Sequence, residues 1–287
     1  MPIIELRNVS YRYGSGTPFE KQALSDISLS VSAGAYIGII GHTGSGKSTL
    51  IKQMNGLLRP ESGQVRVDGE DIWRTPHQIR SVRFRIGLVF QYPETQIFED
   101  TVQKEIMYGP KNMGLSDRET QSRVLNALNF VGLDASYLER NPFRLSGGEM
   151  RRIAIAGVIA MRPQVLILDE PTAGLDPAGR KEILDRLESY RKQTGSAVIL
   201  VSHSMEDIAE RVDQVIVIDQ GSLVMSGAPA VIFSQADRLE SLGLDIPPVT
   251  KLLHLLNQAG YPVNTAALTV SQAEAEILKL FRGSDSL

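Results

Sequence analysis

Residues 41–49 read Gly-His-Thr-Gly-Ser-Gly-Lys-Ser-Thr, and this stretch decides the fold. It matches the phosphate-binding loop pattern G-x-x-x-x-G-K-[ST] at every fixed position. Residues 35–40 before it form a short apolar run typical of a buried strand, and residues 47–55 continue without a helix breaker. A turn that binds nothing is disfavoured, because neither packing nor solubility requires Gly-Lys-Ser. The stretch therefore predicts a strand, a phosphate-binding turn and a helix.

Each part of such a loop has its own task. Gly41, Gly44 and Gly46 let backbone N–H groups turn inward around phosphates, and the N-terminus of the following helix favours their negative charge. Lys47 would reach the β and γ phosphates of a nucleotide, and Ser48 would place its hydroxyl on Mg²⁺.

Composition limits the class of protein. The chain has 287 residues, 42% of them hydrophobic, which is enough for one large domain or two with a substantial core. Its net charge of -3 argues against a general nucleic-acid binder, although a local basic patch stays open. The absence of cysteine rules out disulfides and thiolate metal sites, which suits a reducing cytosol.

The sequence shows no membrane-crossing segment. Its first residues, Met-Pro-Ile-Ile-Glu, lack the basic and long apolar regions of a secretory signal. No uncharged apolar run reaches the roughly 18 residues that a spanning helix requires. If the protein works at a membrane, we expect other subunits to span it.

Residues 145–149, Leu-Ser-Gly-Gly-Glu, place a second glycine pair at the start of a second predicted helix, residues 150–161. Ser146, Gly147 and Gly148 could therefore form a second anion site. A simple glycine-containing helix cap is the structural alternative, and it stays open at this point, because Ser-Gly-Gly occurs in many loops.

Residues 165–170, Val-Leu-Ile-Leu-Asp-Glu, form an apolar strand that ends in two carboxylates. Open α/β sheets place ligands at the C-terminal ends of strands, and a solvated charge pair rarely follows such a run directly. We expect Asp169 to hold Mg²⁺, in part through water, and Glu170 to orient and polarise a water for attack on the γ phosphate.

Three further residues are candidates with structural alternatives. Tyr13 precedes a glycine break, so its ring could stack on an adenine, or it could simply pack at a strand end. His203 follows a buried strand as Glu170 does and could contact the same γ phosphate, although a lone histidine there is usually structural or exposed. Asp176 is predicted to cap a helix that begins with Pro177.

The remaining pattern predicts the order of elements. Gly109-Pro110 is expected to end the helix before it, and Ser116 with Glu119 forms a capping box that opens the next one. Strands are predicted at residues 3–13, 23–31, 63–69, 85–91 and 197–201 with a hairpin at 215–225, a loop at 92–98, and helices at 101–108, after 116, at 249–258 and at 271–281.

Together these motifs resemble the ATP-binding-cassette (ABC) ATPases over residues 3–235. In that family two cassettes close head to tail, and each ATP lies between the phosphate loop of one and the signature motif of the other. The output is motion, since ATP joins the cassettes and hydrolysis releases them. The motifs that carry the resemblance occur in this order: the phosphate loop, Gln91, residues 145–149, the strand with Asp169 and Glu170, residues 173–176, and His203.

The resemblance implies roles for single residues. Glu149 departs from it, because the family usually has glutamine there. The implied roles are adenine stacking for Tyr13, phosphate and Mg²⁺ binding for Lys47, Ser48 and Thr49, sensing of Mg²⁺ and water for Gln91, binding of the opposite γ phosphate for Ser146, Gly147 and Gly148, a catalytic base for Glu170, a switch histidine for His203, and a link between the two sites for Asp176.

The same resemblance implies an α/β fold of the P-loop NTPase type. It has a RecA-like mixed sheet core, an antiparallel β subdomain and a helical subdomain at about residues 92–162, all within a nucleotide-binding domain of residues 1–235. Residues 236–287 are interpreted as a small C-terminal helical extension that packs on the body or on a partner. A disordered tail is the alternative, and its leucine content argues against it.

Residues 90–98, residues 16–20 (Gly-Thr-Pro-Phe-Glu) and the short tail resemble the ATPases of energy-coupling-factor transporters, prokaryotic importers of vitamins and of nickel or cobalt ions. Residues 16–20 further resemble the second of their two paralogous ATPases. The resemblance implies a heterodimer with a homologous ATPase at the cytoplasmic face of the cell membrane. A transmembrane coupling subunit would dock beside Gln91, a small membrane subunit would bind the substrate, and no nucleic acid would take part.

Other classes stay open. An ATPase of a conventional binding-protein-dependent importer would share every catalytic motif. A soluble cassette protein of translation or DNA repair is disfavoured, because the former resembles two cassettes in one chain and the latter carries a long coiled coil. Here Gln91 and Leu145 are only 54 positions apart. A module that binds nucleotide without catalysis is disfavoured by the presence of both Glu170 and His203.

Overall fold

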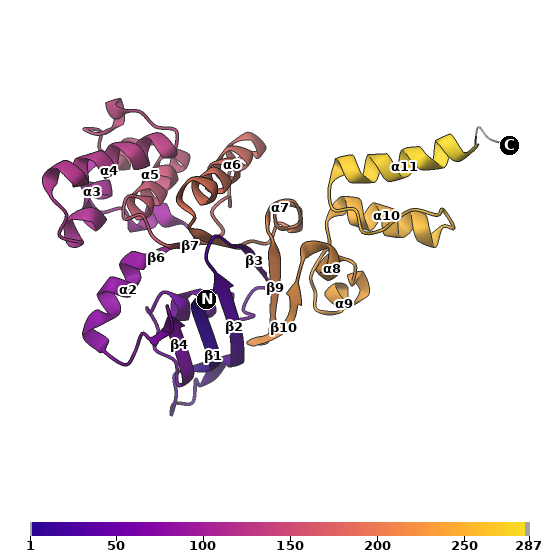
Figure 1. Ribbon diagram of the computed structural model, residues 1–287, viewed down its shortest axis with the longest axis horizontal. Helices are drawn as coiled ribbons and strands as arrows, with labels where there is room; N and C mark the ends of the chain where they lie inside the picture. The colour runs from indigo at the N-terminus through magenta and orange to yellow at the C-terminus, as the bar shows by residue number, and fades with distance from the viewer. Residues whose placement is uncertain (1, 285–287) are drawn as a thin grey trace.

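The computed structural model describes residues 2–284, and its strands form two sheets (Figure 1). One is a four-stranded antiparallel sheet in the order β2-β1-β4-β5. The other has six strands in the order β10-β9-β3-β8-β7-β6, parallel except for the hairpin of β9 and β10. The strands are β1 (Pro2–Tyr13), β2 (Lys21–Ser32), β3 (Tyr36–Ile40), β4 (Ser62–Val67), β5 (Glu70–Asp71), β6 (Ile86–Val89), β7 (Val165–Asp169), β8 (Ala197–Val201), β9 (Gln214–Asp219) and β10 (Ser222–Gly227).

Helices surround the six-stranded sheet and extend from both ends of the molecule. In Figure 1, α3, α4 and α5 gather at one end, and α10 and α11 project from the other. The helices are α1 (Lys47–Met54), α2 (Ile79–Arg85), α3 (Val102–Asn112), α4 (Asp117–Phe130), α5 (Gly147–Ile159), α6 (Pro177–Thr194), α7 (Met205–Arg211), α8 (Pro229–Phe233), α9 (Ala236–Ser241), α10 (Pro248–Gln258) and α11 (Val270–Ser284).

The central strand β3 explains why the sheet is buried on both faces. Its side chains alternate between two apolar clusters, as the two-residue period of a strand requires. Ile37 and Ile39 face the cluster shared with the antiparallel sheet, whereas Tyr36 and Ile40 face the cluster shared with the helices. The mixed sheet, the antiparallel sheet and the helical group were all predicted, and the structure confirms them.

Two predictions of where an element ends were wrong. Residues 85–91 are not one strand, because Arg85 ends α2 and β6 covers only Ile86–Val89, so Gln91 lies beyond the strand. Gly109-Pro110 does not end a helix either, since α3 continues to Asn112. A Cβ at Gly109 would lie 2.7 Å from Met161 Cγ, so this glycine allows α3 to pack closely beside the end of α5. Tertiary packing outweighs the helix-breaking tendency of Pro110.

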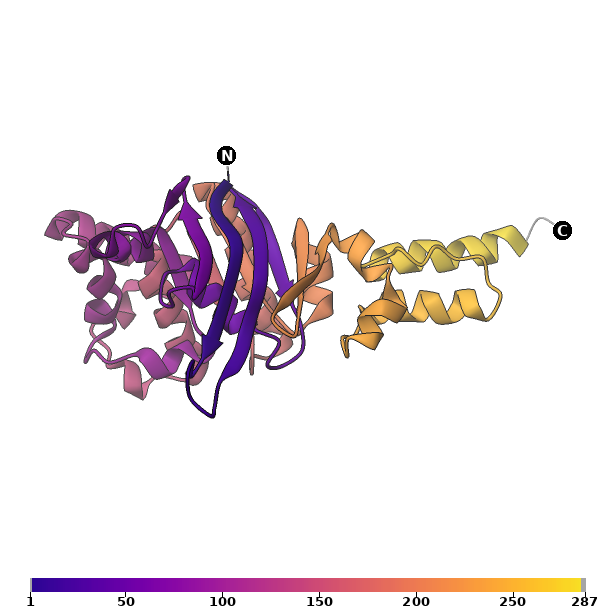
Figure 2. The same cartoon turned by 90° about the horizontal axis from the view of Figure 1, so that it is seen from below.

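The predicted tail helices are confirmed as α10 and α11, which lie side by side (Figure 2). They enclose a small apolar cluster of their own, formed by Leu253, Val263, Ala267 and Ala273. Thr250 Oγ1 donates to the carbonyl of Ala267 at 2.7 Å and closes this unit. Within residues 2–284, none of the helices is both long enough and apolar enough to cross a bilayer.

Candidate nucleotide site

The phosphate loop connects β3 to α1, as the sequence predicts. Gly46 caps α1 with φ 110°, a left-handed conformation that disfavours any residue with a side chain. A Cβ on Gly46 would lie 2.5 Å from the carbonyl oxygen of Ala23, so β2 leaves no room for one. Gly44 also has a positive φ, 82°. Glycine is therefore required at Gly46 by both the backbone conformation and its surroundings.

Lys47 lies folded back into this loop. It is 7% exposed, and its Nζ donates to the carbonyls of Gly41 at 2.7 Å and His42 at 3.0 Å. Burial lowers the pKa of Lys47, while the nearby carboxylates of Glu170 and Asp169 act in the opposite direction. Within residues 2–284 Lys47 forms no ion pair, so its charge is available to an anion in the loop.

Ser48 and Asp169 meet although they are 121 positions apart in sequence. Ser48 Oγ, on the first turn of α1, donates to Asp169 Oδ2 at 3.0 Å at the end of β7. Asp169 is 7% exposed, and burial raises the pKa of its carboxyl group, while the Ser48 hydrogen bond lowers it. The two motifs thus place a hydroxyl and a carboxylate together beside the loop.

Glu170 follows β7 in a strained conformation. Its φ is 51°, in the left-handed region that a residue with a side chain rarely adopts, and such strain concentrates at functional sites. Burial and the neighbouring charge of Asp169 raise the pKa of Glu170 to about 7. His203 Nε2 lies 3.5 Å from Glu170 Oε1, which is too long for a good hydrogen bond. Burial, followed by the charge of Lys47, lowers the pKa of His203, so the imidazole is neutral at pH 7.

Tyr13 lies at the rim of the phosphate loop. Its hydroxyl is 3.2 Å from Thr49 Oγ1, and 40% of the residue is exposed. Tyr11 contacts it edge to face with ring centroids 4.9 Å apart. A hollow of about 200 Å³ opens here between β1, β2 and α1, and its lining includes Tyr13, Lys47, Ser48 and Thr49.

The other predicted site residues lie apart from this group. Gln91 is exposed beyond β6 and forms no hydrogen bond within the described chain. Asp176 caps α6 by accepting from the N–H of Gly179 at 3.0 Å, as predicted. No hydrogen bond or ion pair among residues 2–284 connects residues 146–148 to the phosphate loop. The structure therefore brings most of the predicted site residues together around the phosphate loop and leaves Gln91, Asp176 and residues 146–148 apart from it.

Comparison with known proteins agrees with this geometry. A family model described as "ABC transporter" matches residues 24–173. Proteins named energy-coupling factor transporter ATP-binding protein EcfA2 are similar over the full length: that of Clostridium tetani is 48% identical, covering 97% of both chains, and that of Caldanaerobacter subterraneus is 47% identical, covering 100% of both. This chain belongs to that family of ABC ATPases. Its activity is ATP hydrolysis coupled to transport.

Solved structures support the cassette fold. The structure of cbiO1 from Clostridium perfringens, described as part of the ABC transporter complex cbiONQ, has a TM-score of 0.75 and 35% identity, covering 89% of this chain and 99% of that one. The cassette MJ0796, solved as a dimer in a post-hydrolysis state with ADP and Pi, has a TM-score of 0.72 and 26% identity, covering 79% and 98%.

The cassette contains a buried ion pair that sequence reasoning missed. Arg151 in α5 is 5% exposed and donates to both carboxylate oxygens of Glu94, in the segment that follows Gln91. Arg151 also donates to the carbonyl of Ala173, after Glu170. One guanidinium thereby joins α5, the signature helix that begins within the signature motif of residues 145–149, to the segment after Gln91 and to the segment after Glu170. The helical spacing of Arg151 with the buried Ile155 and Ile159 was the available signal that it faces inward.

A second missed contact anchors the phosphate loop to the hairpin. His42 Nε2 lies 2.9 Å from Asp219 Oδ1 at the end of β9, and Gly221 N donates to the carbonyl of Ser45 at 2.8 Å. Neither contact could be found from local patterns, because the partners are far apart in sequence. The loop is therefore fixed on one side by the hairpin turn.

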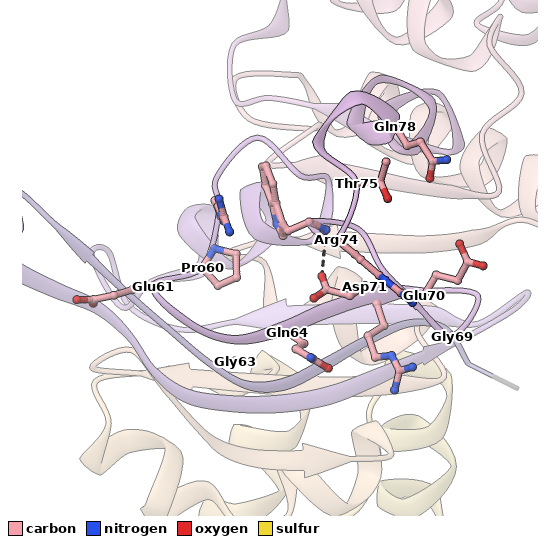
Figure 3. Close-up of a pocket in the computed structure, with 13 residues that line it drawn as sticks. Pro60, Glu61, Gly63, Gln64, Gly69, Glu70, Asp71, Arg74, Thr75 and Gln78 are labelled. Atoms are coloured by element: carbon pink, nitrogen blue, oxygen red, sulfur yellow. Dashed lines mark hydrogen bonds between the residues drawn. The ribbon is translucent and has the colours of Figure 1, made fainter.

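A larger hollow, of about 870 Å³, lies elsewhere on the cassette (Figure 3). Residues of β4, β5 and the segment before α2 line it, among them Gln64, Asp71, Arg74 and Gln78. It contains none of the predicted nucleotide-site residues, and both positive and negative side chains line it. Size alone thus does not locate the nucleotide site, which is recognised by its chemistry.

Proposed function

We propose that this cassette hydrolyses ATP as one half of a head-to-tail heterodimer with a second, homologous ABC ATPase. The observation that carries the proposal is the separation of the two anion sites within one chain. Lys47, Ser48, Asp169 and Glu170 converge, whereas Ser146 lies at the start of α5 with no bond to them. A partner's signature motif completes the first group, and Ser146 with Gly147 and Gly148 completes the partner's site.

We propose Mg²⁺ as the cofactor of this site, held by Ser48 and Asp169 and, with ATP bound, by Gln91. The oxygen donors of Ser48 and Asp169, 3.0 Å apart, suit this ion. Among residues 2–284 there is no group of three or more His, Cys, Asp or Glu side chains that could hold a metal. This fits a cation that binds together with substrate phosphates. When bound, the ion would supply charge stabilisation to the phosphates of the nucleotide.

We propose the following roles for the remaining residues. Glu170 accepts the proton of the attacking water, since its raised pKa gives it appreciable basicity near neutral pH. The neutral His203 contacts the γ phosphate from the end of β8. Lys47 and Thr49 bind the phosphates of ATP, and the backbone around Gly41, Gly44 and Gly46 encloses these phosphates. Tyr13 stacks on the adenine. Asp176 links the two ATP sites of the dimer.

We further propose a docking groove for a transmembrane coupling subunit, which a small substrate-binding membrane subunit joins. A hollow of about 330 Å³ lies between β6, α3 and α5, beside the segment after Gln91. Phe98 and Tyr108 line it; they are 57% and 52% exposed, with ring centroids 4.9 Å apart. Exposed aromatic pairs of this kind are typical of protein interfaces. A helix of the coupling subunit in this groove would lie next to Gln91. Through that residue, ATP binding and hydrolysis could change the position of the helix.

We propose that the cassette is a peripheral subunit at the cytoplasmic face of a prokaryotic cell membrane, where it drives import of vitamins or metal ions. A groove suited to a membrane subunit supports this location. We assign residues 1–235 to the nucleotide-binding domain, with the helical subdomain at about 92–162, and residues 236–287 to an extension. The separate cluster around Leu253 supports this division.

Two experiments test the proposal. Glu170→Gln should abolish ATP hydrolysis and leave ATP binding intact, whereas Glu240→Gln, on the exposed side of α9, should change neither. Undiminished hydrolysis by Glu170→Gln would contradict the assigned base. Secondly, affinity purification of the tagged chain from detergent-solubilised membranes should recover a second cassette and membrane subunits. Recovery of a conventional permease pair, or of the chain alone, would contradict the assembly.

A further inference from the structure

A polar cluster at the start of α5 surrounds the carboxylate of Glu149. Glu149 Oε2 accepts from the backbone N–H of Ser146 at 2.8 Å and from Ser146 Oγ at 2.7 Å. Glu149 Oε1 accepts from the hydroxyl of Tyr137 at 2.7 Å. The guanidinium of Arg140 lies 4.0 Å from the centre of the Tyr137 ring. Both carboxylate oxygens are therefore engaged, one by each neighbour.

The hydrogen bonds fix the direction in which the Ser146 proton points. An ionised carboxylate can only accept, so Ser146 Oγ must donate its single proton to Glu149. Ser146 Oγ also accepts from the N–H of Glu149 at 3.3 Å, which completes the capping box. The hydrogen bonds from Ser146 lower the pKa of Glu149, so the carboxylate stays charged at neutral pH.

A phosphate oxygen is also only an acceptor. In the proposed heterodimer, the γ phosphate of the opposite cassette would compete with Glu149 for the one Ser146 proton. It would also approach a carboxylate of like charge at the same helix N-terminus, where that charge offsets the attraction of the free N–H groups. Both effects oppose contact with a γ phosphate. ADP has no γ phosphate, so its binding should not depend on them.

We propose that Glu149 is a positioning residue that withholds the Ser146 hydroxyl, so that this chain's signature motif closes on ATP less tightly than the same motif with a neutral residue. The inference rests on the proposed head-to-tail pairing. Tyr137 takes part, because its bond to Oε1 directs Oε2 toward Ser146.

The contact with Ser146 is not imposed by helix position. Glu119 occupies the equivalent third position of α4, after the cap Ser116. Its carboxylate turns away and accepts from Arg123 Nη2 at 2.7 Å instead, so the capping box predicted from the sequence was wrong in its glutamate half. A glutamate at this position can therefore leave the capping serine free, and the pair Ser116–Glu119 supplies a matched control.

The test uses the heterodimer purified through a tag on this chain. Glu149→Gln keeps the capping box through its amide oxygen, which still accepts from the N–H of Ser146, and it removes the negative charge. The Ser146 hydroxyl is then held by a neutral hydrogen bond in place of a charge-assisted one, and the like charge beside the γ phosphate is gone. Binding of the non-hydrolysable analogue AMP-PNP and of ADP, each with Mg²⁺, is measured by calorimetry. We expect AMP-PNP to bind about three- to tenfold more tightly to the variant, the size expected when a charge-assisted hydrogen bond is replaced. ADP binding and the Glu119→Gln control should be unchanged.

Tyr137→Phe provides a second measurement. It should tighten AMP-PNP binding by a smaller factor than Glu149→Gln, and its effect should shrink in the Glu149→Gln background, because the two residues act through one contact. AMP-PNP binding that is unchanged or weaker in Glu149→Gln would overturn the inference while leaving the pairing intact. If no second cassette is purified, the pairing fails, and this inference fails with it.

Discussion

Arg151 donates to both carboxylate oxygens of Glu94, at 3.3 and 3.2 Å, and thereby joins the signature helix to the segment that follows Gln91. The side chains are 6% and 20% exposed. Removing one partner of such a pair leaves a poorly solvated charge. We therefore expect Glu94→Ala to lower the free energy of unfolding by about 2–3 kcal/mol, measured by urea denaturation.

The control for this prediction is the exposed pair of Lys104, in the first turn of α3, and Asp100, which precedes that helix; the two charged groups are 2.8 Å apart. Asp100→Ala should give no resolvable change, because solvent screens surface pairs. Combining Glu94→Ala with Arg151→Met should recover part of the loss, since it removes the orphaned charge. If the double variant is no more stable than the sum of the single effects predicts, the two residues are not coupled.

Glu170 should make the stability of the cassette depend on pH. Its folded-state pKa of about 7 exceeds the ordinary value of 4.5. Between these values the folded state binds more protons than the unfolded state, so this group's contribution to stability is lost as pH rises through that window. Glu170→Gln should therefore match the wild type near pH 4.5 and exceed its stability at pH 8 by about 1–3 kcal/mol. Equal stability of the two proteins at pH 8 would contradict the raised pKa.

The same carboxyl group should govern the pH dependence of hydrolysis. Only the ionised form of Glu170 accepts a proton, so kcat/KM for ATP should rise about tenfold per pH unit below the pKa and level off above about 7. Saturating Mg²⁺ keeps the nucleotide in one ionic form. Burial lowers the pKa of His203. Any change in kcat/KM caused by the titration of His203 should therefore occur at a lower pH than the change caused by Glu170. A flat profile from pH 5.5 to 8 would argue against Glu170 as the base.

Because the groove beside β6 is separate from the phosphate loop, we expect variants in the groove to lose membrane subunits and to keep ATP binding. Replacing Phe98 and Tyr108 by alanine should remove most of the aromatic surface there without touching the phosphate loop. Co-purification of membrane subunits should fall at least tenfold, the loss expected for aromatic interface anchors, while ATP binding by the isolated chain persists. Phe19→Ala is the control, since Phe19 is 88% exposed and lies in the loop between β1 and β2 of the antiparallel sheet. Retained co-purification would place the docking surface elsewhere.

Contacts encoded by strand ends were predictable from the sequence, whereas contacts between distant loops and helices were not. Ser48 and Asp169 meet because β3 and β7, parallel strands of one sheet with β8 between them, present their C-terminal ends at the same edge, and each motif marks such an end. Arg151 and Glu94 carry no comparable mark, because a buried charge selects its partner through tertiary packing.

Local signals also failed where packing overrode them. Pro110 lies inside α3, although its missing N–H weakens the helix, because Gly109 lets that helix approach Met161 closely. The roles of Gln91, Asp176 and the signature residues depend on a second chain. For this reason they stay predictions, whereas the places of Lys47 and Glu170 can be described within one chain.

Gly46 offers the sharpest test of the phosphate loop itself. Alanine there would have to keep a φ of 110° and place its Cβ 2.5 Å from the Ala23 carbonyl oxygen, a backbone atom of β2 that cannot rotate away. We expect Gly46→Ala to cost more than the 1–3 kcal/mol or so of backbone strain alone, and to abolish ATP binding measured by calorimetry. Gly16→Ala is the matched control: its φ is 78°, but no atom lies within 4 Å of the added Cβ, so only the strain remains. Comparing the two variants separates strain from collision, and normal ATP binding by Gly46→Ala would show that the loop can bind phosphate without this turn.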